Sequence, residues 1–397
     1  MLERQTGSNS TRANPSDRNR RSMQAAGTDA GAIELEPFAD APISLIDTDG
    51  QWCGQTQPQI EPDTLITLYR KLVAARALDE RLGVLQRSGR ISFVAPAAGH
   101  EGAQVGIAHA MRAGHDWLFP YYRDSAMALA LGMQPRELFA QHLATRADPA
   151  KARQMPCHPG SRDLHIFTAV SSIAGQVPPA VGMAMAAKLR ASDEVTVTTF
   201  GDGATSEGDW YAALNMAAAR RAPMLFACEN NRYAISVPFA TQTASPSVCD
   251  KARACGLPGY RVDGMDVVSV YCATQALLQR IRAGDGPALV EFDVYRYGPH
   301  SSADDDSVYR SREEVEAAKK RDPIDRMRRF LDRQGLWDDD KEERLKADIK
   351  SEFDAAIKQA EAAGKQVPDA LFDDVYAERP WHLSQQAAIV AGELAGE

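Results

Sequence analysis

The middle of the chain contains two short apolar runs separated by a segment with helical spacing. Residues 195–200 are rich in β-branched side chains, residues 224–228 are apolar, and the residues from about Ser206 to Arg220 have the periodicity of a helix. This order predicts a βαβ unit, whose two parallel strands lie close together and end at the same edge of the sheet. We therefore expect an α/β fold with a mostly parallel central sheet flanked by helices.

Leucines at helical spacing predict a long amphipathic helix nearer the N-terminus. After Pro62, Asp63 is the expected N-cap, and Gly89 is expected to end the helix. The apolar stripe marks the face that packs on the rest of the protein. It consists of Leu65, Leu68, Leu72, Leu78, Leu82 and Leu85.

The C-terminal third changes in character. Alternating apolar and polar residues after Pro287 predict a strand with one buried face. Beyond Pro323 the chain is rich in charge, and a helix near residues 324–334 is followed by one whose stripe is Leu345, Ile349, Phe353 and Ile357. A basic cluster is expected to form a solvated face or a partner surface. It comprises Lys319, Lys320, Arg321, Arg326, Arg328 and Arg329.

Composition narrows the class of protein. With 397 residues, of which 44% are hydrophobic, the chain is long enough to bury a substantial core. The net charge of −9 argues against a nucleic-acid surface, and no apolar run approaches the roughly 20 residues needed to span a membrane. The six cysteines show no Cys-x-x-Cys spacing, which argues against a zinc site or a disulfide scaffold. We expect a soluble enzyme without nucleic-acid or membrane partners.

The first 36 residues have almost no apolar periodicity and are expected to form a disordered tail. They contain no apolar core of a secretory signal. Arg18, Arg20 and Arg21 leave open a transit segment for the mitochondrial matrix, but Glu3 and Asp17 count against it. We therefore expect a cytoplasmic protein with a tail (1–36), an α/β domain (37–322) and a C-terminal helical region (323–397).

Oxygen-bearing side chains follow both strands of the predicted βαβ unit. Gly201-Asp202-Gly203 comes after the first strand, and Asn231 comes after the second. Because the two strand ends meet, Asp202 and Asn231 are expected to bind a hard cation such as Mg²⁺, which often shares the oxygens of a diphosphate. The glycines and the N–H groups of the following helix can approach the phosphates. The alternative is a pair of ordinary polar turns.

An aromatic pair and an arginine precede an alanine-rich helix. Tyr122 and Arg123, next to Tyr121, are suited to gripping a phosphate. Upstream, a loop of small residues (91–102) can approach a ligand closely, and Phe93 is placed to form a wall of a substrate pocket.

A histidine follows the strand predicted after Pro287. His300 can act as an acid or a base near neutral pH. The neighbouring residues Asp304, Asp305 and Asp306 have no obvious local partner, so we expect this loop to be disordered until a cofactor binds.

Three segments together resemble the alpha subunit of the decarboxylating component of 2-oxo acid dehydrogenase complexes. They are residues 201–207 (Gly-Asp-Gly-Ala-Thr-Ser-Glu), 229–236 (Glu-Asn-Asn-Arg-Tyr-Ala-Ile-Ser) and 295–306 (Tyr-Arg-Tyr-Gly-Pro-His-Ser-Ser-Ala-Asp-Asp-Asp). The resemblance extends over roughly residues 37–382. The last segment looks like the branched-chain members, the 2-oxoisovalerate dehydrogenases, whereas pyruvate members more often have Gly-His-Ser followed by Asp-Pro.

The resemblance implies the thiamine diphosphate-binding fold, with thiamine diphosphate and Mg²⁺ as cofactors. Asp202, Asn231 and the main-chain carbonyl of Tyr233 would coordinate the metal, and His300 would be the catalytic residue. The 2-oxo acid would be bound by Phe93, Tyr122, Met155, Pro156 and Ser171. The implied cofactor-binding residues are Tyr121, Tyr122, Arg123, Ser171, Ile173, Gly201, Asp202, Gly203, Ala204, Thr205, Ser206, Glu207, Asn231, Tyr233, Ala234, Ile235 and His300.

The implied activity is oxidative decarboxylation of a branched 2-oxo acid such as 2-oxoisovalerate, with transfer of the acyl group to the lipoyl group of an acyltransferase component. A glutamate needed to activate the cofactor would come from a beta subunit in an α2β2 heterotetramer. The alternatives are a pyruvate or acetoin dehydrogenase alpha subunit and a cofactor-free scaffold. Two positions depart from the family pattern, because Glu229 stands where some relatives have a phosphate-binding arginine and Pro299 replaces a histidine.

Overall fold

The computed structural model describes residues 33–395, so the predicted tail lies outside the described residues except for residues 33–36. Within residues 33–395, none of the helices combines the length and the apolar character that crossing a bilayer requires. The division of the chain after residues 36 and 322 stays a prediction.

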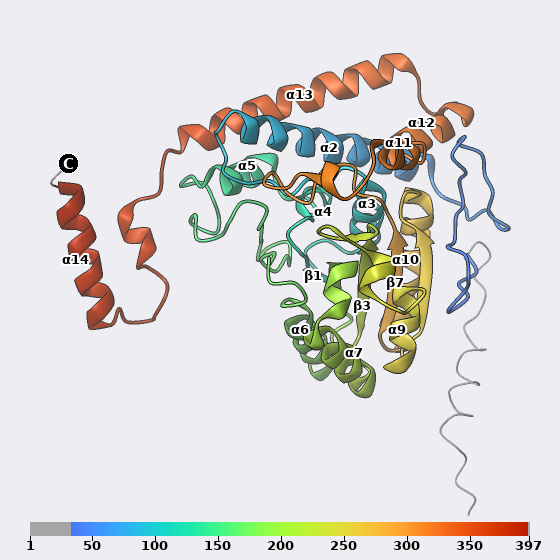
Figure 1. Cartoon of the computed structure of the whole chain (residues 1–397), viewed down its shortest axis with the longest axis horizontal. Coiled ribbons are helices and arrows are strands. Elements are labelled where there is room, and N and C mark those ends of the chain that lie inside the picture. The colour runs from blue at the N-terminus through green and yellow to red at the C-terminus, as the bar shows by residue number, and fades with distance from the viewer. Residues whose placement is uncertain (1–32, 396–397) are drawn as a thin grey trace, which may run out of the picture.

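A twisted sheet forms the centre of the described part of the chain (Figure 1). Its strand order is β1-β2-β3-β7-β6, and every neighbouring pair is parallel. The predicted βαβ unit is confirmed, because β2 and β3 are neighbours joined through α7 (Gly208–Arg220). The strands are β1 (Trp117–Phe119), β2 (Thr196–Gly201), β3 (Met224–Asn230), β6 (Gly259–Asp263) and β7 (Ala288–Asp293).

Helices cover both faces of the sheet, as predicted for an α/β fold, and each face has its own apolar core. Val197 and Leu225 contribute to the core beneath α3 and α10, whereas Phe200 and Phe226 contribute to the core beneath α6, α7 and α9. Strands that are buried on both faces carry nearly continuous apolar residues. The covering helices are α3 (Glu101–Ala110), α10 (Val267–Arg282), α6 (Val177–Leu189) and α9 (Val248–Ala254).

Strand β7 is buried on both faces, so the prediction of a single buried face was wrong. Glu291 is as inaccessible as its apolar neighbours. Its carboxylate accepts hydrogen bonds from the side chain of Asn230 (2.7 Å) and the backbone N–H of Val248 (2.9 Å). The strand lies between β3 and β6, where both faces are covered, and these distant partners satisfy the polar side chain.

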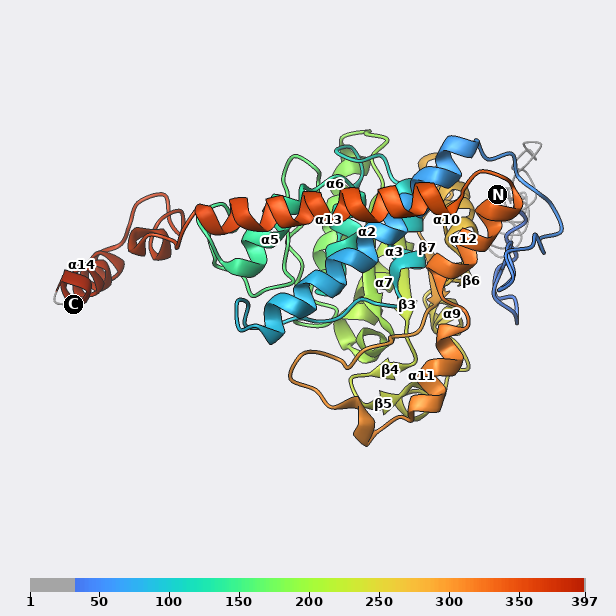
Figure 2. The same cartoon turned by 90° about the horizontal axis from the view of Figure 1, so that it is seen from above.

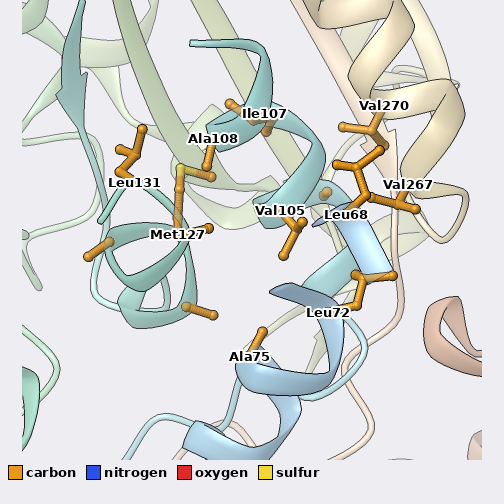
Figure 3. Packing of buried hydrophobic residues seen from close by; sticks show 14 of the residues in the cluster. Leu68, Leu72, Ala75, Val105, Ile107, Ala108, Met127, Leu131, Val267 and Val270 are labelled. Atoms are coloured by element: carbon orange, nitrogen blue, oxygen red, sulfur yellow. The ribbon is translucent and has the colours of Figure 1, made fainter. Parts of the chain in front are cut away.

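The leucine stripe of α2 (Pro62–Arg87) packs on the first core, as predicted. Figure 3 shows Leu68 and Leu72 of α2 close to Val105 of α3 and Val267 of α10. These contacts fix the position of α2, the helix that precedes the loop of small residues (91–102).

The start of α2 differs by a few residues from the prediction. Glu61, rather than Asp63, occupies the N-cap position, and Pro62 is the first helical residue. Proline suits that position because its missing N–H would have no partner there. The end agrees with the prediction, since Gly89 follows the helix with a φ of +74°.

Two helices of the C-terminal region join the same core, α12 (Pro323–Arg333) and α13 (Asp339–Ala362). Phe353 of α13 packs edge-on against Phe139, with ring centroids 5.5 Å apart. In Figures 1 and 2, α13 runs alongside α2, and α14 lies apart from the body of the protein. The other elements are α4 (Ser125–Ala130), α5 (Pro135–Leu143), β4 (Tyr233–Ala234), β5 (Val237–Pro238), α8 (Phe239–Gln242), α11 (Arg312–Lys319), α14 (Trp381–Ala395) and three 3₁₀ turns, Asp202–Ser206, Asp306–Val308 and Pro368–Leu371.

The predicted basic cluster does not form one solvated face. Arg326 is buried, pairs with Asp263 (2.8 Å) and donates to the carbonyl of Ile46. Arg321 pairs with the same carboxylate (2.8 Å). The prediction was wrong for Arg326, because its partners are far away along the chain, where a local pattern does not reveal them, whereas the side chain of Arg321 is still partly exposed.

Candidate active site

Most of the predicted cofactor residues follow the carboxyl ends of β2 and β3, His300 follows β7, and Tyr121, Tyr122 and Arg123 follow β1. Gly201 of β2 is in register with Glu229 of β3, which is in register with Phe292 of β7. The strand order reverses between β3 and β7, and helices α7 and α10 pack on opposite faces there. Open α/β sheets bind ligands in the crevice that such a reversal creates.

Asp202 is the most unusual residue at this edge. Its side chain is buried, and neither carboxylate oxygen has a hydrogen-bond partner in the described part of the chain. Burial raises the pKa of this carboxyl group to about 6, although nearby backbone amides, including that of Asn231, and the charge of Arg296 oppose the rise. A buried carboxylate without partners is costly, and a bound cation would satisfy it.

Asn231 lies beside Asp202, as the strand pairing predicts. It is buried, and its Oδ1 accepts the backbone N–H of Tyr233 at 3.2 Å. Residues 33–395 contain no group of three or more His, Cys, Asp and Glu side chains suited to a metal. A cation here would therefore need the amide and carbonyl oxygens that were predicted alongside the single carboxylate.

The segment after Asp202 forms a 3₁₀ turn, Asp202–Ser206, and α7 begins at Gly208. The predicted helix start at Ser206 and Glu207 was therefore slightly early. The turn is held by the hydroxyl of Thr205 and the side chain of Gln242, which both donate to the carbonyl of Asp202, at 2.7 and 2.8 Å. The side chain from α8 is a contact that local spacing does not reveal.

Arg123, Tyr122 and His300 come together across the site. Arg123 is 2% exposed and donates to the carbonyl oxygen of His300 (3.3 Å), while its Nε has no partner among residues 33–395. The ring of Tyr122 lies edge-on to His300, with centroids 5.9 Å apart, and 5.4 Å from the guanidinium carbon of Arg123. A buried guanidinium with an unused N–H suits an anionic ligand.

His300 sits in a positive environment. Its Nδ1 lies 3.4 Å from the guanidinium groups of both Arg123 and Arg296. Burial and these two charges lower the pKa of the imidazole to about 4, so it is neutral at physiological pH. Because guanidinium groups only donate, Nδ1 is the acceptor and the proton resides on Nε2. His300 therefore presents an N–H donor on its other side.

The acidic residues after His300 have partners nearby, which the sequence analysis did not identify; disorder of this loop before a cofactor binds stays a prediction. Asp304 accepts the backbone N–H of His300 (2.7 Å) and the hydroxyl of Tyr309 (2.6 Å). Asp305 caps the short turn that follows it. Asp306 pairs with Arg310. Each of the three carboxylates therefore has its own partners, of which Tyr309 and Arg310 follow further along the chain.

The other predicted cofactor residues surround these groups. A Cβ at Gly203 would meet the Cβ of Ala234 at 3.0 Å, so glycine permits a close approach there. The carbonyl of Ile235 accepts a hydrogen bond from Arg296 at 2.9 Å. Tyr121 donates its hydroxyl to Glu229 at 3.1 Å. Around the turn, Ala204 and Thr205 are buried and Ser206 and Glu207 are exposed.

The predicted substrate residues Phe93, Met155, Pro156 and Ser171, and the predicted cofactor residue Ile173, differ in their contacts and in their exposure. Val94 exchanges hydrogen bonds with Ser302, which brings the Phe93 loop next to His300. Ser171 pairs with His158 (2.7 Å). Pro156 is partly buried, whereas the apolar side chains of Met155 and Ile173 are 54% and 46% exposed.

Two residues that the sequence analysis did not single out belong to the site. Arg296 is buried and contacts His300, and His100 is buried with its Nδ1 2.6 Å from Glu229. Both lie inside motifs that were quoted for other residues. A charged or titratable side chain inside an otherwise small or apolar segment is the signal that points to them.

Comparison with known proteins decides the family. The family model described as "Dehydrogenase E1 component" matches residues 69–369. The chain belongs to the dehydrogenase E1 component family. The 2-oxoisovalerate dehydrogenase subunit alpha of Bacillus subtilis is 42% identical over 79% of this chain and 95% of its own length. The pyruvate dehydrogenase E1 component subunit alpha of Staphylococcus aureus is 38% identical over 87% and 92%, and 2-oxoisovalerate dehydrogenase subunit alpha 2 of Arabidopsis thaliana is 38% identical over 87% and 74%.

The resemblance stated from the motifs is thereby confirmed, as is the α/β fold with a C-terminal helical extension. As a member of the dehydrogenase E1 component family, the chain is a component of a 2-oxo acid dehydrogenase, and its family implies thiamine diphosphate as the cofactor. The partnerless carboxylate of Asp202 and the unused N–H of Arg123 fit the cation and the anion of such a group.

Proposed function

We propose that this chain is the alpha subunit of a branched-chain 2-oxo acid dehydrogenase that uses thiamine diphosphate and Mg²⁺. The observation that carries the proposal is the buried carboxylate of Asp202, which has no hydrogen-bond partner among residues 33–395 and lies next to Asn231 at the carboxyl ends of β2 and β3. A scaffold without a cofactor would have no reason to keep a costly charge at this place.

Each residue has a role in the proposed reaction. Asp202, Asn231 and the carbonyl of Tyr233 would hold Mg²⁺, and Arg123 with Tyr122 would grip the diphosphate. Bound thiamine diphosphate supplies the electron sink for loss of carbon dioxide. His300 keeps its proton on Nε2, where it can donate to an oxygen of the substrate and take the proton back.

The proposed substrate is an aliphatic, branched 2-oxo acid such as 2-oxoisovalerate. The resemblance of the His300 segment to branched-chain members and the name of the Bacillus subtilis relative support this choice. The apolar residues Phe93, Met155 and Pro156 suit an aliphatic side chain. A pyruvate dehydrogenase is the second candidate, because the Staphylococcus aureus relative has nearly the same identity.

The site is proposed to be completed by a beta subunit in an α2β2 assembly, which then passes the acyl group to a lipoyl-bearing acyltransferase component. The exposed apolar side chains of Ile173 and Ile235 support this partner, since a covering subunit would remove them from water. The glutamate that activates the cofactor would come from the beta subunit.

The decisive experiment is carbon dioxide release from 2-oxoisovalerate and from pyruvate, measured for the chain alone and for the chain co-expressed with its beta subunit. Activity only in the complete mixture, with higher efficiency for 2-oxoisovalerate, is the expected result. Higher efficiency for pyruvate would replace the substrate assignment. Activity of the isolated chain would contradict the proposal that a beta subunit completes the site. The absence of activity in every mixture would favour a scaffold without a cofactor.

A further inference from the structure

A buried histidine connects Glu229 to Asn231. Nδ1 of His100 lies 2.6 Å from Oε2 of Glu229, and its Nε2 lies 3.3 Å from Nδ2 of Asn231. The side chains of His100 and Glu229 have no exposed surface. His100 precedes α3, whereas the other two residues lie at the end of β3, so the fold and not local sequence brings the three together.

The orientation of the Asn231 amide is set at both of its ends. Its Oδ1 accepts the backbone N–H of Tyr233, which leaves Nδ2 facing His100. An amide nitrogen only donates, so Nε2 of His100 is the acceptor and the imidazole proton resides on Nδ1. That tautomer then requires an acceptor at Nδ1.

Glu229 provides this acceptor. Besides Nδ1 of His100, the amide nitrogen of Gln104 (3.2 Å) and the hydroxyl of Tyr121 (3.1 Å) face its Oε2. Three donors converge on one oxygen, so this oxygen of Glu229 accepts all three hydrogen bonds. The direction of every hydrogen bond from Glu229 through His100 to Asn231 is thereby determined.

We propose that Glu229 and His100 are positioning residues that hold the Asn231 amide with its oxygen toward the cation. The inference rests on the proposed function, because it assigns these residues to the Mg²⁺ of that same site. If the His100 proton moved to Nε2, this N–H and the NH₂ group of Asn231 would be two donors facing each other. The side-chain amide of Asn231 would then rotate by about 180°. Its NH₂ group would then point at the cation, which binds only oxygen.

The test uses the full chain assembled with its beta subunit. Calorimetry measures thiamine diphosphate binding as a function of the Mg²⁺ concentration, and the quantity compared is the Mg²⁺ concentration at which binding is half-saturated. His100→Phe keeps the ring volume and removes both nitrogens, and Glu229→Met keeps a similar length and removes both acceptor oxygens. Partners of metal ligands typically contribute about 10- to 100-fold to metal affinity, so both variants should raise the half-saturating Mg²⁺ concentration by about tenfold or more. The affinity for thiamine diphosphate at saturating Mg²⁺ should change much less.

A matched control is Gln104→Met, which removes another donor to the same oxygen of Glu229 without touching Asn231. It should leave the half-saturating Mg²⁺ concentration near that of the wild type. The double variant of Glu229→Met and His100→Phe should lose no more than His100→Phe alone, because the two act in series. If His100→Phe does not fold, Glu229→Met carries the test by itself.

The outcomes separate the two proposals. If Asn231→Ala weakens Mg²⁺ binding but Glu229→Met and His100→Phe do not, the positioning role is wrong and the proposed function stands. If the variants at Glu229 and His100 have a lower thermal midpoint but an unchanged Mg²⁺ dependence, the two residues only stabilise the fold. That result would also overturn the inference. If Asn231→Ala and Asp202→Ala themselves leave Mg²⁺ dependence unchanged, the proposed function fails.

Discussion

The guanidinium group of Arg296 lies 3.4 Å from Nδ1 of His300. Together with Arg123 it makes the imidazole a poor base while the site contains no anion, and it fixes the proton on Nε2. A diphosphate that neutralised these charges would raise the pKa of His300 toward its ordinary value, which would couple the state of the histidine to the cofactor.

We therefore predict that His300 is neutral in the cofactor-free enzyme down to about pH 5, because its pKa is lowered to about 4. The rate of its modification by diethyl pyrocarbonate, quantified on the His300 peptide by mass spectrometry, should stay constant from pH 8 to about pH 5 and fall below that. A half-maximal rate near pH 6.5 would contradict the assigned environment. Arg296→Gln should move the midpoint upward.

The ion pairs of Asp263 predict an acid-sensitive contribution to stability. Burial alone would raise the pKa of this carboxyl group, but Arg326 and Arg321 outweigh burial and hold the pKa below its usual value. The stabilisation is therefore present at neutral pH and is lost as the pH falls through the lowered pKa. The difference in thermal midpoint between the wild type and Asp263→Asn should be largest near pH 7 and shrink as the pH is lowered to 3. A difference that grows on acidification would contradict the ion pairs.

We predict that Phe353 stabilises the packing of α13 on the apolar core. It is 2% exposed and packs on Phe139, so Phe353→Ala should lower the free energy of unfolding by about 3–5 kcal/mol. The neighbouring Glu352 is exposed, so Glu352→Ala is the control and should change the free energy of unfolding by less than about 0.5 kcal/mol. Urea denaturation of both variants checks the prediction; similar midpoints would show that α13 does not contribute to the core.

The loop before α3 is predicted to tolerate no side chain at Gly99. A Cβ there would lie 1.8 Å from the carbonyl oxygen of Tyr295, and the residue has a φ of +97°. Gly89 has a φ of +74°, but a Cβ added there would have no other atom of the described residues within 4 Å. Gly89→Ala should therefore cost only the backbone strain of about 1–2 kcal/mol. Gly99→Ala should cost more than its control in denaturant unfolding and should also weaken cofactor binding, because His100 follows it directly. Equal effects of the two changes would contradict the close approach.

Much of this architecture could be predicted from the sequence because the relevant signals are local. The β-branched run before Asp202 and the apolar run before Asn231 predicted two parallel strands, and strand geometry alone placed the two side chains at one edge. The stripe of α13 predicted its buried face in the same way.

The parts that could not be predicted depend on partners distant in the sequence or on the direction of a side chain. The burial of Arg326 depends on Asp263, and the burial of Glu291 depends on Asn230 and the start of α9. Alternation of polar and apolar residues does not reveal such partners. Asp304 appeared free of partners although Tyr309 lies only five residues further along the chain, because the sequence does not show in which direction a loop side chain points.

The most direct test of the central claim is binding of thiamine diphosphate to the enzyme assembled with its beta subunit, with and without Mg²⁺, compared with Asp202→Asn. Wild-type enzyme should bind the cofactor only when Mg²⁺ is present. The variant keeps the shape of the side chain and removes a buried, partnerless charge, so it should fold with an equal or higher thermal midpoint and lose Mg²⁺-dependent binding. Cofactor binding by the variant with the same Mg²⁺ dependence as the wild type would contradict the claim.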